Sequence, residues 1–354
     1  MSVIAATGSG VTKRWEPAVV RAAITGVGYA TPSRLWTSRE VETRIKEASG
    51  RLPIPGGRLE SISGIRTRFM VGPGEYASTL AIEAGRRALA DAAVAASAID
   101  LLVFASASHD QIEPATAHIV AEGLGVNAPA FDAKNACNSF INGVEIAEAF
   151  IRTGRARRAL VVSGETPSLV TRWKVGSIRE LKRSFIGYTM GDLGTAAVVE
   201  AASDGRGIFY SYHHATSKHW RIVQVVGGGS RHPGAEPDTF FSEGDGTALR
   251  DAFLEVDDEH MALLFRETGT SWDDYAIVCA HQVAVPFIGD LVRKIGLPLE
   301  RLILTVDTFG NVSSGSLPLG LAIAKADGRV KPGDRVMWIG LGAGISVAAM
   351  AFTL

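Results

Sequence analysis

Apolar positions along the chain form two patterns that alternate with one another. Short, almost continuous apolar runs indicate buried strands, and they lie at Leu101–Ser106, Ala159–Ser163, Ala276–Cys279 and Val336–Ile339. Amphipathic helices are indicated where apolar residues recur every three or four positions, at Ser78–Ala93 and Asn138–Thr153. Strands that are apolar throughout are typical of parallel sheets covered by helices on both faces. The pattern therefore predicts an α/β fold built on parallel sheet.

The order of these elements repeats once along the chain. The segment Phe131–Glu165 reads as strand, polar turn, helix and strand, and Leu304–Gly344 reads in the same order. A further apolar strand precedes each segment. We therefore predict two similar α/β halves meeting near residue 200, with Cys137 and Asn311 at corresponding turns. The predicted boundaries are a flexible tail at 1–20, a first half at 21–200 and a second half at 201–354.

Composition excludes several classes of protein. The chain has 354 residues, and its 36 basic residues nearly balance 37 acidic ones, so that a net charge of −1 gives no global attraction to nucleic acid or to an anionic membrane. Two cysteines do not make a disulfide framework, and the default compartment is then a reducing cytoplasm. The N-terminus lacks the pattern of a signal peptide, and no apolar run reaches the ~18 residues that span a bilayer. We expect a soluble, cytoplasmic protein.

Cys137 is the first candidate for chemistry. It follows a predicted strand and stands at the start of a predicted helix, within the sequence Asn-Ala-Cys-Asn. Unpaired N–H groups and the helix dipole favour a thiolate at such a position and can also hold an oxyanion. We therefore interpret Cys137 as a nucleophile with a lowered pKa, which partly activates itself. Cys279 lies in the middle of a strand, and we interpret it as structural.

His281 and Asn311 are the candidate partners of this thiol. Both follow strands of the second half, where they can face Cys137 across the junction of the halves. A thiol, an imidazole and an amide together suit acyl transfer. The chain has no metal-ligand spacing, and too few residues follow Gly340–Gly344 for this glycine-rich run to open a dinucleotide-binding unit. We expect acyl-transfer chemistry without a metal or a bound cofactor.

Four motifs occur in an informative order: Asn-Ala-Cys at 137, Ala-His-Gln at 281, Gly-Asn-Val-Ser-Ser-Gly-Ser from 310, and Gly-Leu-Gly-Ala-Gly from 340. This order resembles the ketoacyl-acyl carrier protein synthase III enzymes of the thiolase superfamily, from about Ala23 to Leu354. The resemblance implies the thiolase fold, in which two duplicated α/β halves form a layered αβαβα core. It also implies a dimer and a catalytic set: Cys137 as nucleophile, His281 and Asn311 as its partners, and an oxyanion hole from the backbone N–H groups of Cys137 and Ala343.

A second resemblance concerns the loop that carries Glu113. The sequences Ser-His-Asp-Gln-Ile-Glu-Pro from 108 and Ser-Gly-Glu-Thr from 163 are similar to the OleA-type enzymes, which join two fatty acyl-CoA molecules head to head. This resemblance implies that Glu113 reaches into the partner subunit's site and acts as a base. Two plain acyl thioesters condense only after an α-proton is removed, which requires a base within hydrogen-bond reach. A carboxylate on an apolar loop would have its pKa raised by desolvation and would be a better base.

The sequence therefore predicts a Claisen condensation of two acyl thioesters, carried by CoA or by acyl carrier protein, through an acyl group on Cys137. His281 and Asn311 then act after acylation by binding the enolate oxygen. Three alternatives stay open: decarboxylative condensation with a malonyl thioester, acyl transfer to a hydroxyl or amine in secondary metabolism, and a non-catalytic subunit of a heterodimer. We expect a homodimer, with a heterodimer as the alternative. The segments 165–190 and 212–245 match no pattern, which leaves acyl-chain length and carrier open.

Overall fold

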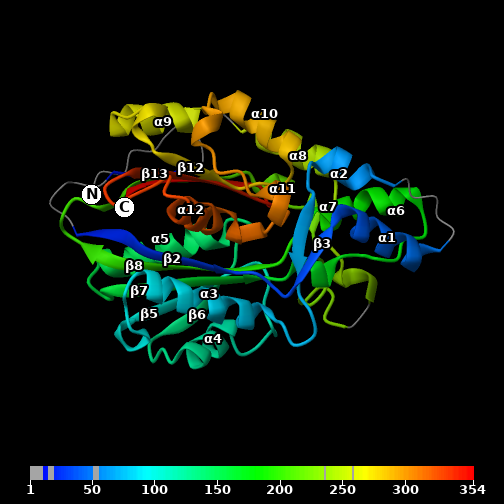
Figure 1. Cartoon of the computed structure of the whole chain (residues 1–354), viewed down its shortest axis with the longest axis horizontal. Helices are drawn as coiled ribbons and strands as arrows, with labels where there is room; N and C mark the ends of the chain where they lie inside the picture. Colours follow the sequence, from blue (N-terminus) through cyan, green and yellow to red (C-terminus); the bar gives the residue numbers. More distant parts are fainter. Residues whose placement is uncertain (1–10, 15–19, 51–55, 235–236, 257–258) are drawn as a thin grey trace.

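The structure is a computed structural model that describes residues 11–14, 20–50, 56–234, 237–256 and 259–354. Within these residues, two five-stranded sheets lie face to face and make an elongated, layered molecule (Figure 1). No helix in the described ranges is both long enough and apolar enough to cross a membrane.

The first sheet is built from the N-terminal half of the chain. Its strands stand in the order β2, β8, β7, β5 and β6, with bounds Arg21–Ala30, Leu193–Ala202, Arg158–Glu165, Leu101–Ala105 and Ala130–Ala133. Strand β5 runs parallel to both of its neighbours, whereas β8 runs antiparallel to β7 and β2.

The second sheet repeats this arrangement. Its strands stand in the order β1, β9, β14, β13 and β12, with bounds Val11–Arg14, Gly207–Ala215, Ser346–Thr353, Arg335–Gly342 and Ile277–Ala280. Strands β9, β14, β13 and β12 pair with the same directions as β2, β8, β7 and β5. Residues 11–14 of the predicted flexible tail are therefore a paired strand, while residues 1–10 and 15–19 of that prediction lie outside the described residues.

Helices fill the space between the sheets and cover their outer faces (Figure 1). The central pair is α5 (Ser139–Arg152) and α12 (Ser316–Ala326), which pack into one apolar cluster with strands of both sheets. Helices α3 (Ala77–Asp91) and α4 (Thr116–Leu124) cover the first sheet. The second sheet is covered by α8, α9 and α10, with bounds Gly246–Leu254, Glu259–Thr268 and Val285–Ile295. The layers are those of the thiolase fold, which confirms the fold class expected from the sequence.

Helix α5 illustrates why the apolar pattern predicts these layers. Its residues Phe140, Val144, Ala147 and Ile151 recur at helical spacing, and all four are buried.

Two expectations about the strands were wrong. The sheets are mixed rather than parallel, because a strand buried on both faces is apolar whichever way its neighbours run. The strand expected near Leu304 is only an isolated bridge between Val278 and Leu302.

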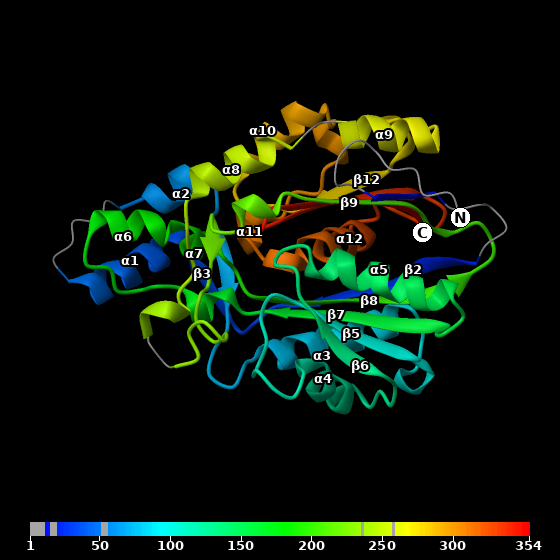
Figure 2. The ribbon, with the colours of Figure 1, turned by 180° about the vertical axis from the view of Figure 1, so that it is seen from behind.

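Smaller elements gather at one end of the layers, on the right in Figure 1 and on the left in Figure 2. They come from distant parts of the chain: β3 (Arg34–Thr37), α1 (Ser38–Ser49), α2 (Arg58–Ser63), β4 (Thr67–Met70), α6 (Ile178–Arg183), α7 (Phe185–Thr189), β10 (Val223–Gln224), β11 (Glu243–Gly244) and α11 (Val306–Phe309). Helix α1 begins with a capping box, in which the Thr37 side chain accepts a hydrogen bond from the Glu40 backbone N–H and the Glu40 carboxylate accepts one from the Thr37 N–H. The segments that matched no sequence pattern supply several of these elements, because α6 and α7 lie within 165–190 and β10 and β11 lie within 212–245.

Candidate active site

Cys137 stands on a tight turn between β6 and α5. The residue before it, Ala136, has φ 47°, a left-handed conformation that is uncommon for a residue with a side chain. The Asn138 N–H closes the turn on the Asn135 carbonyl at 3.0 Å, and the Ser139 hydroxyl accepts the Asn135 N–H at 2.8 Å. Strained turns of this kind often occur where a side chain must be held for function. The turn holds the thiol two positions before Ser139, the first residue of helix α5.

Asn138 joins this turn to the second half of the chain. Its side-chain Nδ2 donates to the Ser346 carbonyl at 3.1 Å and to the Ser346 hydroxyl at 2.9 Å. A Cβ atom at Gly340 would lie 2.3 Å from Asn138 Oδ1, so only glycine leaves room for this side chain. Ala343 lies between Gly340 and Ser346 along the chain, and its backbone N–H favours negative charge on the Cys137 sulfur. Asn138 therefore holds the second expected oxyanion donor beside the thiol.

His281 follows strand β12 and is only 2% exposed. Its Nδ1 lies 3.2 Å from the Ser316 hydroxyl, and the imidazole also hydrogen-bonds the backbone of Ser313. Burial lowers the pKa of His281 to about 4, and the contact with Ser313 opposes this shift only weakly. The ring is therefore neutral at pH 7 and can accept a proton.

Asn311 lies between α11 and α12 and is also 2% exposed. The preceding Gly310 has φ 71°, and a Cβ atom there would lie 2.9 Å from the Thr189 carbonyl oxygen. The Asn311 backbone N–H donates to that same carbonyl at 2.8 Å, which fixes the turn. The side-chain Oδ1 accepts the Ser313 N–H at 3.0 Å. This orientation leaves the side-chain NH₂ group to donate to a substrate oxygen.

Ser313 contacts all three of the expected catalytic residues. Its hydroxyl donates to Cys137 Sγ at 3.7 Å, its N–H donates to Asn311 Oδ1, and its backbone hydrogen-bonds the His281 ring. The structure thus brings Cys137, His281 and Asn311 together from two halves of the chain, around a residue to which sequence reasoning assigned no role.

The expectation of a lowered thiol pKa was wrong. Burial raises the pKa of Cys137 to about 12, and the negative charge of Glu165 acts in the same direction. The Ser313 hydroxyl and the Ala343 and Cys137 N–H groups do favour the thiolate, as expected at this turn, but burial outweighs them. The resting site therefore holds a neutral thiol beside a neutral imidazole, not a thiolate–imidazolium pair.

Glu113 lies apart from this cluster, on an exposed loop between β5 and α4. Among the described residues, no recorded contact joins it to Cys137, His281 or Asn311, and its neighbour Ile112 is 72% exposed. The apolar surroundings expected around Glu113 are therefore absent within one subunit, because the loop projects from the surface.

The base of this loop is nevertheless tied to the site. The fully buried Glu165 accepts the Ala107 N–H at 2.9 Å and the Ser108 hydroxyl at 3.1 Å. Glu165 also accepts a hydrogen bond from Ser314, the residue after Ser313. One carboxylate thus connects the Glu113 loop to the turn that carries Asn311 and Ser313.

A cavity of about 640 Å³ opens next to the cluster. It is bounded by Thr189, whose carbonyl holds the Asn311 backbone, and by Val283, two residues after His281. Its lining is mainly apolar, with three basic side chains: Lys182, Arg183 and Arg250. This composition suits a long apolar group with an anionic end. Within the described ranges, no group of three or more His, Cys, Asp or Glu side chains is placed to hold a metal ion.

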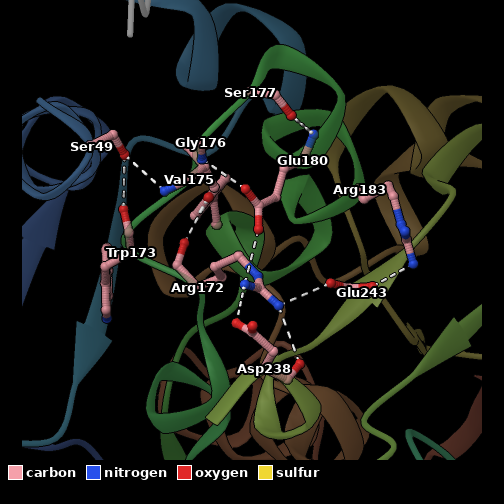
Figure 3. Close-up of polar contacts among 11 residues, drawn as sticks. Ser49, Arg172, Trp173, Val175, Gly176, Ser177, Glu180, Arg183, Asp238 and Glu243 are labelled. Carbon is pink, nitrogen blue, oxygen red and sulfur yellow. Dashed lines mark hydrogen bonds and ion pairs between the residues drawn. The ribbon is translucent and has the colours of Figure 1, made fainter. Parts of the chain in front are cut away.

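Buried Arg172 holds the two unassigned segments together beside this cavity (Figure 3). Its guanidinium pairs with Glu180 at 2.9 Å in the first segment, and with Asp238 at 2.8 Å and Glu243 at 3.1 Å in the second. It also lies 4.5 Å from the centre of the Phe241 ring. We call Arg172, Glu180, Asp238 and Glu243 the Arg172 cluster. Because Arg183, on the cavity wall, pairs with Glu243 as well, the cluster helps to position that wall.

Four supporting residues were missed from the sequence: Ser313, Ser316, Asn138 and Glu165. Asn138, Ser313 and Ser316 stand inside or beside the motifs that identified Cys137 and Asn311, and Glu165 stands in the Ser-Gly-Glu-Thr sequence from 163. Their contacts, however, join residues far apart in the chain; Asn138 and Ser346, for example, are separated by 208 positions. The only signal in the sequence was the density of hydroxyl and amide residues within those motifs.

Solved structures of OleA from Xanthomonas campestris have the same fold. One, with bound lauric acid and lauroyl-CoA, superposes with a TM-score of 0.84 at 26% identity and covers 94% of this chain and 99% of that one. Another, with bound cerulenin, gives a TM-score of 0.85 at 25% identity, covering 97% of this chain and 100% of that one. Further structures of that enzyme carry replacements of one cysteine, one glutamate or one histidine.

Sequence comparison identifies the family. The 3-oxoacyl-[acyl-carrier-protein] synthase III model matches residues 131–217, and the C-terminal model of the same family matches residues 265–354. β-Ketoacyl-[acyl-carrier-protein] synthase III of Erythrobacter litoralis is 34% identical over 343 residues, covering 94% of this chain and 98% of that protein. The enzyme of the same name from Novosphingobium aromaticivorans is 35% identical over 344 residues, covering 93% and 98%. The chain therefore belongs to the 3-oxoacyl-[acyl-carrier-protein] synthase III family, and it is a thiolase-fold transferase of the Claisen-condensing type.

Proposed function

We propose that this enzyme condenses two acyl-CoA molecules without decarboxylation, through an acyl group carried on Cys137. The geometry around Ser313 supports the shared acyl-enzyme step, and the mainly apolar cavity, whose lining includes three basic side chains, suits a long acyl thioester. The lauroyl-CoA bound in the similar OleA structure is an acyl thioester of this kind.

The first half-reaction would load Cys137. The neutral thiol must lose its proton as its sulfur attacks the acyl-CoA carbonyl, and the neutral His281 ring accepts that proton. The N–H groups of Cys137 and Ala343 hold the oxyanion of the tetrahedral intermediate. The intermediate then expels the CoA thiolate, which takes the proton from His281 and leaves as CoA.

The second half-reaction would form the carbon–carbon bond. Glu113 of the partner subunit removes an α-proton from the second acyl-CoA. His281 and the Asn311 NH₂ group hydrogen-bond the enolate oxygen, and the enolate carbon attacks the Cys137 thioester. The tetrahedral intermediate expels the Cys137 thiolate, and the β-ketoacyl-CoA product leaves. The thiolate then takes up a proton from water, and Glu113 releases the α-proton to water, so that both groups return to their starting state.

The position of Glu113 carries the choice of this reaction over its alternatives. The glutamate and the histidine replaced in the OleA variants stand the same number of positions apart as Glu113 and His281. The separation between the replaced cysteine and the replaced histidine differs by two positions from the separation between Cys137 and His281 in this chain. A further observation in favour is that Glu113 is exposed and projects from the subunit, as a residue serving a neighbouring site must.

Decarboxylative condensation with a malonyl thioester is the second candidate. It is favoured by sequence, because the synthase III relatives are 34–35% identical to this chain, against 25–26% for the OleA structures. Such an enzyme needs no base for the α-carbon, since loss of CO₂ supplies the carbanion. The two reactions therefore make opposite demands on Glu113.

The decisive experiment supplies one acyl-CoA and no malonyl thioester. Wild-type enzyme should acquire one acyl group and release the β-ketoacyl product, and α-deuterium from a labelled substrate should exchange into water. The Glu113→Gln variant should acylate normally but lose condensation and exchange by roughly 10²–10⁴-fold, the usual contribution of a general base. Glu122→Gln, the same substitution at an exposed residue of α4, serves as the control.

Three other outcomes would each refute this proposal. If product forms only with malonyl thioester and CO₂ release, and Glu113→Gln is as active as wild type, the decarboxylative reaction is correct. If the acyl-enzyme transfers its acyl group only to an added alcohol or amine, the enzyme is an acyltransferase to oxygen or nitrogen. If no acyl-enzyme forms at all, the chain is the non-catalytic partner of another subunit.

A further inference from the structure

Ser313 is placed to act on the Cys137 sulfur directly. Its hydroxyl is the side-chain donor recorded on that sulfur, at 3.7 Å, and Ser313 is only 5% exposed. The residue has φ 51°, and its N–H is fixed on Asn311 Oδ1 at 3.0 Å. Its carbonyl accepts the Ser316 hydroxyl at 3.1 Å. With the backbone held on both sides, the hydroxyl is aimed at the sulfur.

We propose that the Ser313 hydroxyl is a further catalytic group, which donates a hydrogen bond to the Cys137 sulfur whenever that sulfur carries negative charge. This inference rests on Cys137 being the nucleophile, and it is independent of which second substrate is used. Negative charge arises on the sulfur twice: when the thiol loses its proton to attack the acyl donor, and when the second tetrahedral intermediate expels the sulfur. The hydroxyl transfers no proton in either step.

The need for this donor follows from how the backbone N–H groups are shared. In the resting site, the Ala343 and Cys137 N–H groups both favour negative charge on the sulfur. In the tetrahedral intermediates the same two groups are needed by the carbonyl oxygen, which then carries the negative charge. They cannot fully stabilise both atoms at the moment when charge passes between oxygen and sulfur. The Ser313 hydroxyl can stay on the sulfur throughout.

Burial makes this single hydrogen bond valuable. Because burial disfavours the thiolate, each remaining donor to the sulfur has a large effect on its charge. Of the groups that lower the pKa of Cys137 against burial, the Ser313 hydroxyl has the largest effect. A hydrogen bond to a charged group typically contributes enough to change a rate by about 10- to 100-fold.

The test uses a Cys279→Ala background, so that Cys137 is the single thiol of the chain. Ser313→Ala and Ser313→Gly both remove the hydroxyl, but only glycine is free at φ 51°. Iodoacetamide alkylation of Cys137 is followed by mass spectrometry between pH 7 and pH 10. Both variants should react about 10- to 100-fold more slowly than the background protein at every pH, so that the logarithm of the rate against pH is displaced in parallel.

The same pair of variants distinguishes an effect of the Ser313 hydroxyl from an effect of the Ser313 backbone conformation. If Ser313→Gly matches the background protein while Ser313→Ala is slow, Ser313 serves only to fix a left-handed turn and the proposal fails. It fails equally if both variants match the background protein. If Ser313→Ala does not fold, Ser313→Gly alone decides the question in the same way. Alkylation needs no substrate, so failure here is distinct from failure of the proposed condensation.

Discussion

The neutral state of His281 can be tested through the pH dependence of stability. In the unfolded chain this residue titrates near 6.5, whereas burial lowers its native pKa to about 4. As pH falls below 6.5 the unfolded chain gains a proton that the native state refuses, so the native state loses stability until pH reaches about 4. At pH 5 the unfolded chain lies about 1.5 units below its own pKa, while the native ring is still mostly neutral. The unfolding free energy is then lower by about 2 kcal/mol, at 1.36 kcal/mol per unit.

Asp192 acts in the opposite direction over the same range. Burial raises the pKa of this carboxyl to about 6, so the native state takes up a proton before the unfolded chain does. Its protonation therefore adds about 1.4 kcal/mol of stability between neutral pH and pH 5. Because the two contributions oppose one another, the unfolding free energy of the wild type alone shows little of the His281 effect. The measurement must therefore compare variants.

Urea unfolding of wild type, His281→Gln and Asp192→Asn at pH 7.5 and pH 5.0, at one protein concentration, separates the two contributions. On moving to pH 5.0, His281→Gln should gain about 2 kcal/mol relative to wild type, and Asp192→Asn should lose about 1.4 kcal/mol relative to wild type. If wild type and His281→Gln change stability equally, the native ring titrates near 6.5 and burial does not lower its pKa. If wild type instead gains stability relative to His281→Gln, the native pKa is raised, the ring is largely protonated at neutral pH, and the acylation step proposed above would be wrong.

Three further predictions concern the site and its surroundings. Intact-protein mass after incubation with acyl-CoA should show one acyl group that is lost in Cys137→Ala and retained in Cys279→Ala; acyl mass on any other residue would contradict the assignment. Asn311→Ala should still acylate but lose condensation by about 10²-fold. His281→Ala should be impaired in both half-reactions, because the buried thiol has no lowered pKa of its own. Equal acylation by His281→Ala and wild type would refute the role of the ring. Arg172→Met should cost about 1–3 kcal/mol of unfolding free energy, less than for a fully buried pair because its carboxylates are partly exposed. The same variant should speed proteolysis of residues 212–245. An unchanged cleavage rate would mean that Arg172 does not hold that segment.

The sequence predicted the layers and located Cys137, His281 and Asn311, which the structure brings together, because both depend on local patterns. Apolar runs and helical spacing located β5, β7, β12, β13, α3 and α5. The turn before α5 identified Cys137. Strand direction was not predictable in this way, because burial is the same for parallel and antiparallel neighbours.

The protonation states could not be derived from the same patterns. A helix N-terminus lowers a thiol pKa, but the opposing effect of burial depends on every atom packed around the sulfur. The role of Ser313 was hidden for a related reason: its hydroxyl meets a cysteine 176 positions away, and its direction depends on a left-handed φ that a serine seldom adopts.

The Arg172 cluster also bears on how substrate range could be altered. One buried cation is shared by a carboxylate from one segment and two carboxylates from another, so replacing either segment alone would strand charges at their junction. Chimaeras that graft the region 165–190 or 212–245 from a relative should therefore be made as matched pairs. For the same reason, natural variation in the two segments is expected to be correlated, so that in evolution and in protein engineering they behave as one exchangeable module.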